Sequence, residues 1–217
     1  MANVSRVQGL RPIKHIDGAP WNGTLNRYFV AAADTFPIFQ GDLVTLAATT
    51  DTKGQTVIPG VPSIGGTQGA RKFISSGGSA DTAAVGVAVG FSINPLNLNT
   101  PQFRSASVAQ YILVSDAPDT VYEVQSSVAP TPTDLNGNAT ILDSNLTAGA
   151  STPTALSLAT GQSAIVVNAY AVPGTTNILK VMGASQKIDN DITSVNYKIL
   201  VTINNHQYSG GTGTAGV

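Results

Sequence analysis

The chain has few side chains that can transfer protons or be oxidised: of its 217 residues none is cysteine, two are histidine, and Glu123 is the single glutamate. The absence of cysteine excludes disulfide bridges and thiolate metal sites, and suits a protein made in a reducing cytoplasm. The scarcity of histidine and glutamate leaves few candidates for general acid–base work. We therefore expect an architectural protein that is not an enzyme and has no cofactor.

Long hydrophobic runs and a strong charge of either sign are also missing. No stretch approaches the roughly 18–20 apolar residues that span a bilayer, and the first residues lack the apolar segment of a secretory signal. The formal net charge is −1 and the pI is about 6.0, which gives the molecule no electrostatic bias toward nucleic acid or an anionic membrane. We expect neither of these partners and no small-molecule substrate.

The chain is instead rich in short apolar runs separated by turn-forming residues. Valine, isoleucine, threonine and tyrosine favour strands, whereas glycine, proline, asparagine, aspartate and serine favour turns. The runs span residues 27–33, 42–48, 70–75, 83–91, 108–115, 120–125, 163–170, 177–182 and 196–204. No long helical pattern or internal repeat accompanies them. The sequence predicts an all-β fold, an antiparallel β-barrel or β-sandwich, of which a jelly roll is one form.

Two of these runs alternate in the way that half-buried strands require. In residues 120–125, Tyr122 and Val124 share one face, and Glu123 lies on the other. In residues 196–204 the apolar face is formed by alternate residues, namely Tyr197, Ile199, Val201 and Ile203. These faces are the expected core.

Punctuation by glycine and proline divides the chain into three parts. Residues 1–30 lack a sustained period and read as an extended N-terminal arm. Residues 31–205 form the β core, with a long loop excursion at about 126–160 in which short strands are expected at 139–143 and 155–158. Residues 206–217 form a Gly-rich C-terminal extension.

The arm combines positive charge with apolar side chains. Asp17 is the only acid in residues 1–33, whereas residues 105–179 contain five acids and no lysine or arginine. Opposite charges in the two regions would attract each other within one subunit or between two, although a patchy surface can also arise by chance. The candidate partner-binding residues are Val4, Arg6, Leu10, Arg11, Ile13, Lys14, Ile16, Trp21 and Arg27.

Other motifs point to turns and loops more than to chemistry. The segment 65–72 is Gly-rich and basic but lacks the spacing of a phosphate-binding loop. The acidic segments 134–138 and 189–191 resemble part of a calcium loop without its terminal glutamate, so we expect no metal site. No nucleophile elbow is present for a Ser–His–Asp triad. Glu123 and an aspartate could form a glycosidase pair, but Glu123 on an alternating strand favours a solvent-facing role.

Several short blocks along the chain are similar to segments of a known protein family. The first are Ala2–Val7 (ANVSRV), Gly9–Pro12 (GLRP) and Gly18–Gly23 (GAPWNG). The later ones are Gly41–Val44 (GDLV), Val85–Phe91 (VGVAVGF), Tyr111–Val114 (YILV) with Asp116 and Pro118, Tyr122–Gln125 (YEVQ), and Lys198–Gln207 (KILVTINNHQ) before a Gly-rich tip. In this order they resemble virion structural proteins of tailed bacteriophages, over most of the chain outside residues 126–160.

The resemblance implies a head accessory protein. Cement or decoration proteins of this kind bind the major capsid protein on the outer shell, stabilise the mature head, are rich in β-structure and are commonly homotrimers. It thus implies a location on the capsid surface of the virion after synthesis in the host cytoplasm. A tail or fibre-tip protein that binds host glycans is the main alternative. A major capsid protein is disfavoured because the long spine helix is missing, and a polysaccharide hydrolase because acid–base residues are few.

Overall fold

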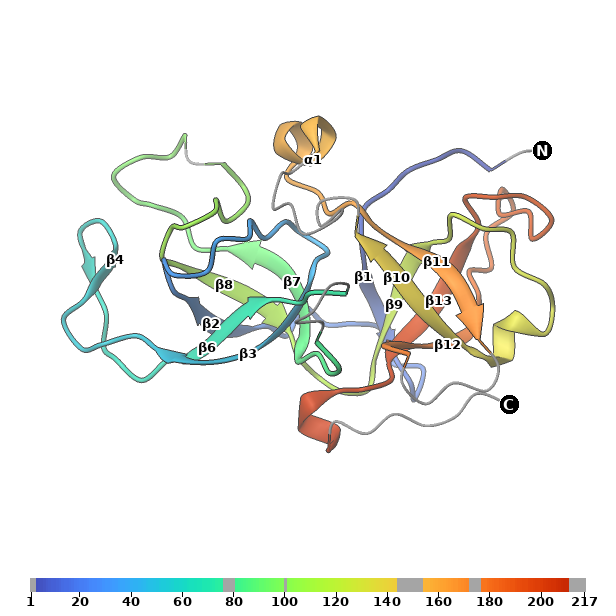
Figure 1. Ribbon diagram of the computed structural model, residues 1–217, viewed down its shortest axis with the longest axis horizontal. Coiled ribbons are helices and arrows are strands. Elements are labelled where there is room, and N and C mark those ends of the chain that lie inside the picture. The colour runs from blue at the N-terminus through green and yellow to red at the C-terminus, as the bar shows by residue number, and fades with distance from the viewer. Residues whose placement is uncertain (1–2, 76–80, 100, 144–153, 172–176, 211–217) are drawn as a thin grey trace.

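The computed structural model describes residues 3–75, 81–99, 101–143, 154–171 and 177–210. Two β-lobes lie side by side along the long axis of the molecule (Figure 1). One lobe is a closed five-stranded barrel and the other is a six-stranded sheet. Each of the nine runs predicted to be strands overlaps an observed strand, and the all-β fold is confirmed.

The barrel is built from the first half of the chain. Its strands, in their order around the barrel, are β2 (Asn26–Val30), β6 (Gln68–Lys72), β3 (Leu43–Thr50), β7 (Gly86–Phe91) and β8 (Gln110–Ser115). All described pairs are antiparallel except β2 with β6. A short hairpin, β4 (Thr56–Ile58) and β5 (Val61–Pro62), lies between β3 and β6 in the chain and forms the far end of this lobe (Figure 1).

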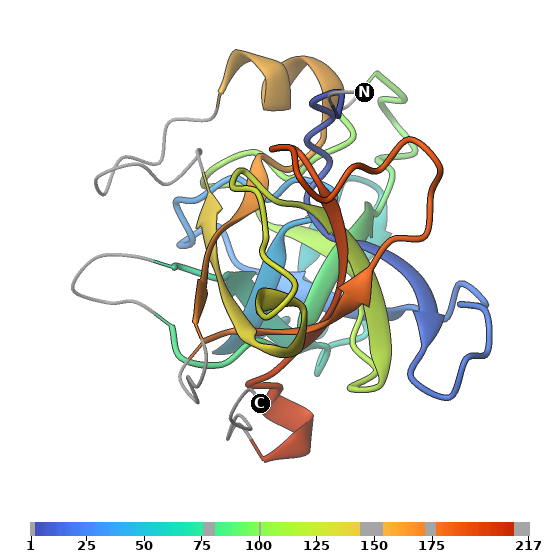
Figure 2. The same cartoon turned by 90° about the vertical axis from the view of Figure 1, so that its right-hand side faces the viewer.

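The second lobe takes one strand from the N-terminal region and five from the second half of the chain. Its order is β1 (Arg11–His15), β9 (Thr120–Gln125), β13 (Lys198–Ile203), β12 (Leu179–Ala184), β10 (Asn138–Asp143) and β11 (Ile165–Ala171). The backbone N–H of Ser127 donates to the carbonyl of Val167 over 2.8 Å. The sheet therefore curls until β11 approaches the end of β9 (Figure 2).

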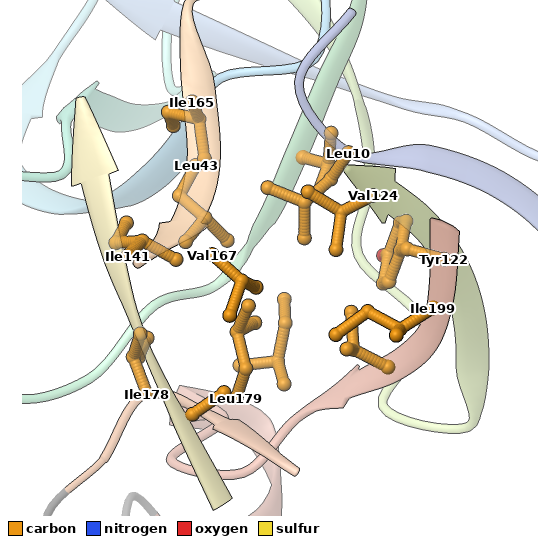
Figure 3. Packing of buried hydrophobic residues seen from close by; sticks show 14 of the residues in the cluster. Leu10, Leu43, Tyr122, Val124, Ile141, Ile165, Val167, Ile178, Leu179 and Ile199 are labelled. Carbon is orange, nitrogen blue, oxygen red and sulfur yellow. The ribbon is translucent and has the colours of Figure 1, made fainter. Parts of the chain in front are cut away.

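The core of the sheet lobe follows the predicted alternation. The four apolar residues of β13 and its approach, together with Tyr122 and Val124 of β9, are buried in one cluster (Figure 3). Leu43 and Val87 reach into the same cluster from the barrel strands β3 and β7. Each fully buried aliphatic side chain contributes roughly 1.5–3 kcal/mol through burial. Because the lobes share this core, their packing holds them in a fixed relation.

In the excursion at 126–160, one of the two predicted strands is present and the other segment is a helix. Residues 139–143 belong to β10, as predicted. The expected strand at 155–158 is wrong, because this segment forms the short helix α1 (Ala155–Thr160). The Thr154 side chain accepts a hydrogen bond from the Ser157 N–H, and Gly161 ends the helix with a φ of 69°. A capping threonine and a left-handed glycine seven residues apart thus overrode the strand propensity.

The predicted arm and tail are placed in part. Residues 3–10 are extended without strand pairing, but residues 11–15 and 26–30 of the predicted arm are strands of the two lobes. The excursion also contains the 3₁₀ turn η1 (Asp134–Asn136), and the tail begins with η3 (Gln207–Ser209). Residues 144–153 of the excursion and 211–217 of the tail lie outside the described residues.

Candidate docking surface

The beginning of the arm is fixed to its own sheet lobe. The Asn3 side chain donates to the carbonyls of Asp191 and Val195 over 2.8 and 3.1 Å, and accepts from the Asp191 N–H over 2.7 Å. The backbone N–H of Arg6 donates to Oε1 of Gln125 over 2.7 Å. These contacts leave the Arg6 side chain and Val4 at the surface, Val4 being 67% exposed.

Leu10, one of the predicted contacts, is almost entirely buried. It is 2% exposed, packs in the core of the sheet lobe, and donates its N–H to the carbonyl of Gly41 over 3.0 Å. A β-carbon on Gly9 would lie 2.5 Å from the Gly41 oxygen. Because both positions are glycine, the two backbones cross closely enough to drive Leu10 into the interior.

The remaining candidates divide between two places. Arg11, Ile13 and Lys14 lie on β1, and Ile16 follows it with 54% of its surface exposed. Arg27 lies on β2 of the barrel, with its guanidinium carbon 4.7 Å from the centre of the Tyr111 ring. The structure therefore does not bring all nine predicted residues into one patch.

Three of them do line one cleft. Leu10, Arg11 and Trp21 form part of the wall of a cleft of about 560 Å³, with Gln40 and Val89 also among its lining residues. Trp21 is half-buried, and its backbone N–H donates to the Ile13 carbonyl over 3.2 Å. Trp21, one of the candidate partner-binding residues, is thus held by β1 and lines an open cleft.

A second cleft of about 540 Å³ continues from the first, because Gln40 and Val89 line both. Its other residues include Ile93 and Leu98 from the loop after β7, which are 69% and 78% exposed. We call the two clefts together the β7 groove; it is lined by Arg11, Trp21, Gln40, Val89, Ile93 and Leu98, among others. Such exposed apolar side chains beside a hollow are typical of interaction sites.

Along the groove, β7 extends beyond its pairing with the neighbouring strand β3. In the described part of the chain, β3 pairs with β7 at Leu43–Val87 and Val44–Gly86. Beyond these pairs, the backbone of Ala88 bonds to Gly41 and Asp42, just before β3. The chain turns away at Gly41, and β7 continues to Phe91 with β8 as its described strand partner. Residues 89–91 are half-buried there. A strand edge next to a groove is suited to an extended partner segment.

Helix α1 and the loop after β7 border the same face. A β-carbon on Gly161, at the end of α1, would lie 3.0 Å from the Gln102 carbonyl of that loop. Both segments lie along the upper edge of the molecule in Figure 1. Leu156 and Leu158 of α1 are 62% and 48% exposed. The end of α1 therefore lies beside the loop that lines the groove.

Glu123, the candidate acid of a glycosidase pair, is held by hydrogen bonds from two neighbouring side chains. Its oxygens accept from Ser185 Oγ over 2.6 Å and from Lys187 Nζ over 2.8 Å. Burial acts to raise the pKa of Glu123, but the bonds from Lys187 and Ser185 prevail and lower it below its ordinary value. A general acid needs the opposite shift, since it must hold a proton near neutral pH.

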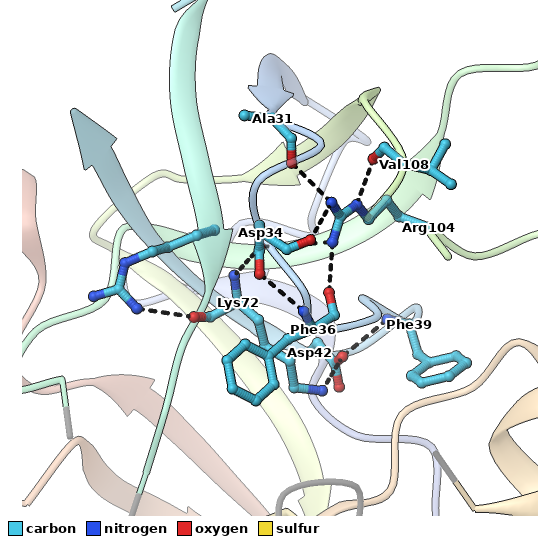
Figure 4. Close-up of polar contacts among 9 residues, drawn as sticks. Ala31, Asp34, Phe36, Phe39, Asp42, Lys72, Arg104 and Val108 are labelled. Carbon is cyan, nitrogen blue, oxygen red and sulfur yellow. Dashed lines mark hydrogen bonds and ion pairs between the residues drawn. The ribbon is translucent and has the colours of Figure 1, made fainter. Parts of the chain in front are cut away.

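The most buried charged groups were missed by the sequence analysis. Arg104 is wholly buried and donates to the carbonyls of four residues over 2.6–2.8 Å (Figure 4); these are Ala31, Asp34, Phe36 and Val108. Lys72, at the end of β6, contacts Asp42 and Asp143 where the two lobes meet. The only signal in the sequence was the presence of a charge within or beside an apolar run, as in residues 70–75.

The structure also bears on metal binding and on membrane spans. Among the residues that the structure describes, no three His, Asp or Glu side chains gather closely enough to hold a metal ion. The same part of the chain contains no helix long and apolar enough to cross a bilayer. Comparison with known proteins found no match to a family model, a curated protein or a solved structure.

Proposed function

We propose that this chain is a structural protein of a tailed-phage virion, a cement or decoration protein that binds the major capsid protein on the outer shell and stabilises the mature head. The observation that carries the proposal is the β7 groove, where an open strand edge, a tryptophan and exposed apolar side chains lie together. The resemblance of the sequence blocks supplies the identity of the partner.

The groove has the features of a protein-binding site. Trp21 and Arg11 are residue types that often dominate binding energy. The apolar surface of Ile93 and Leu98 is exposed to water and would be buried by a bound partner. An extended capsid segment would add to β7 through backbone hydrogen bonds. A protein that binds only the assembled shell stabilises that state by thermodynamic linkage. A trimer on the shell would multiply this effect, since each subunit presents one groove.

The first test is the copy number of the chain in purified particles. Quantitative peptide mass spectrometry gives its ratio to the most abundant shell protein. We expect a ratio near one, because a cement protein covers the lattice. A few copies per particle, or none, would contradict the proposal.

The second test is binding of purified variants to particles that lack the chain. Trp21→Ala and Arg11→Ala should each weaken binding by about 30-fold, the effect of losing a central contact. Arg27→Ala is the matched control, because Arg27 is an exposed arginine outside both clefts. Equal affinities for Arg11→Ala and Arg27→Ala would remove the groove from the interface.

One observation favours the alternative, a tail or fibre-tip protein that binds host glycans. The cleft at Trp21 is also lined by the amide side chains of Gln8, Gln40 and Gln162. An aromatic face with several amides is a combination that binds sugars through stacking and hydrogen bonds. Binding on a glycan array that is lost in Trp21→Ala would favour this function over the cement protein.

A further inference from the structure

Lys72 lies between two aspartates in the interior. Its Nζ is 2.7 Å from Oδ2 of Asp42 and 2.8 Å from Oδ2 of Asp143. The three side chains are at most 1% exposed. The ring of Phe39 lies on another side of the amine, with its centre 5.8 Å from Nζ, and the Phe39 N–H donates to Oδ2 of Asp42 over 2.9 Å (Figure 4).

The charges of this cluster do not cancel. One ammonium and two carboxylates leave a net negative charge in a site without exposure to water, which is costly. Burial raises the pKa of Asp42; Lys72 opposes this rise, and the charge of Asp143 adds to it. The net effect is a raised pKa, which favours the neutral carboxyl of Asp42 beside the Lys72 amine.

From this arrangement we infer that Lys72 and Asp42 form an intramolecular amide bond, and that Asp143 moves the protons. A buried amine, a buried carboxyl in hydrogen-bond contact with it and a second carboxyl on the same nitrogen are the groups that such a condensation needs. The inference concerns the interior and is independent of the proposed docking function.

The step balances without an oxidant or a cofactor. Asp143 accepts a proton from the Lys72 ammonium, and the neutral amine attacks the carboxyl carbon of Asp42. The Phe39 N–H stabilises the negative charge that develops on Oδ2. The bond from carbon to the hydroxyl oxygen then breaks, and the hydroxyl takes a proton from the nitrogen and leaves as one water molecule. The product is a neutral amide, and Asp143 keeps the proton that it accepted from the Lys72 ammonium.

The surroundings favour the amide over its precursors. The reacting atoms are already in contact, so the reaction is effectively unimolecular. The amide carries neither of the charges whose burial is costly, and Asp143, protonated in the step, is neutral as well. The bond would join the end of β6 to the residue before β3, 30 positions apart, in a chain without cysteine.

Intact mass spectrometry of the purified, denatured full chain tests the inference. We expect a mass lower than that of the sequence by one water molecule. Trypsin should then release residues 28–53 joined to residues 72–104, since an acylated Lys72 resists cleavage. The full sequence mass, with peptide 28–53 free, would overturn the inference. A link from Lys72 to the peptide 105–180, which contains Asp143, would overturn the assignment of Asp42 as the acylated residue.

Two variants separate this bond from other losses of water, such as cyclisation at an aspartate. Lys72→Arg keeps a positive charge but supplies no amine for the condensation, and should have its full mass. Asp143→Asn keeps Lys72 and Asp42 but removes the proton acceptor, and should have most molecules at full mass. A loss of water that persists in Lys72→Arg would contradict the inference, and the wild-type peptide result holds even if a variant fails to fold.

Discussion

The phenol of Tyr28 donates a hydrogen bond to Oδ2 of Asp116 over 2.7 Å, and this bond lies at one of the covalent connections between the two lobes. Tyr28 lies on barrel strand β2, whereas Asp116 lies between β8 of the barrel and β9 of the sheet. Asn26 donates to both oxygens of the same carboxylate over 3.0 Å. The Tyr28 oxygen is also 2.7 Å from that of Tyr208 in η3, so the C-terminal turn is tied to the same point.

Removing this phenol should destabilise the protein measurably. Burial and the bond to Asp116 both raise the pKa of Tyr28, so the hydroxyl remains a donor throughout the accessible pH range. Tyr28→Phe should lower the free energy of unfolding by about 1.5–3 kcal/mol, the usual value for a bond to a charged group. Urea unfolding measures this. Tyr208→Phe is the control: Tyr208 is 46% exposed, and its loss should be under about 1 kcal/mol. Equal losses would contradict this role of Tyr28.

Arg104 should tolerate no replacement, including lysine. Its guanidinium satisfies four backbone carbonyls in a site with no exposure, and an ammonium cannot reach four acceptors in that planar arrangement. Arg104→Lys should therefore lower the free energy of unfolding by about 3–5 kcal/mol. Arg71→Lys is the control, because Arg71 is 37% exposed and pairs with a single acid, Asp81. If Arg104→Lys and Arg71→Lys had the same urea midpoint, the prediction would be contradicted.

The sequence predicted the strands well because their signal is local. Alternation in β9 and β13 identified the buried faces, and turn-forming residues marked most boundaries. Strand β1 was missed because Pro12 and the two basic residues Arg11 and Lys14 hide its pattern; it forms through pairing with β9. Helix α1 was missed because six residues are too few to show a helical period.

The candidate site was predicted less completely than the fold. Two residues of the predicted arm, Arg11 and Trp21, line the first cleft. Gln40 and Leu98, in contrast, come from loops far away in the sequence and become neighbours of the groove only through the barrel. The contact of Lys72 with Asp143 likewise depends on how two lobes pack, which no local pattern encodes.

The close crossing of the arm over the barrel makes a quantitative prediction about Gly41. Its φ is +93°, and a β-carbon there would lie 2.4 Å from the Gln8 carbonyl. Gly18 has the same φ with nothing within 4 Å of the added atom. Gly18→Ala should thus cost about 1–2 kcal/mol from backbone strain alone. Gly41→Ala should cost at least about 2 kcal/mol more, because the backbones must move apart.

Thermal or urea unfolding of the two glycine variants gives this difference directly. Because φ is the same at both positions, the extra loss of stability in Gly41→Ala measures the cost of separating the two backbones that cross at Gly41. If both alanine variants were equally stable, the arm would not be packed against Gly41 as the structure has it.

The hydrogen bonds of Asp51 should make the stability of the barrel depend on pH. It accepts hydrogen bonds from Ser63, Thr67 and Tyr111, the last over 2.6 Å, and so holds the loop between β3 and β6. Burial acts to raise the pKa of Asp51, but these bonds lower it to about 2. Because the pKa in the folded state is below the value of about 3.9 in the unfolded chain, Asp51 stabilises the fold above pH ~4. This contribution is lost as the pH falls from about 4 toward 2.

The urea midpoint of the wild type should therefore fall in this range, and part of the fall should disappear in Asp51→Asn. The variant is less stable than the wild type at neutral pH, and the two should converge as Asp51 becomes protonated. Asp189→Asn, a change at an exposed aspartate, should reproduce the wild-type profile. Parallel profiles for the wild type and Asp51→Asn between pH 2 and 4 would mean that the loop does not draw its stability from the ionised carboxylate.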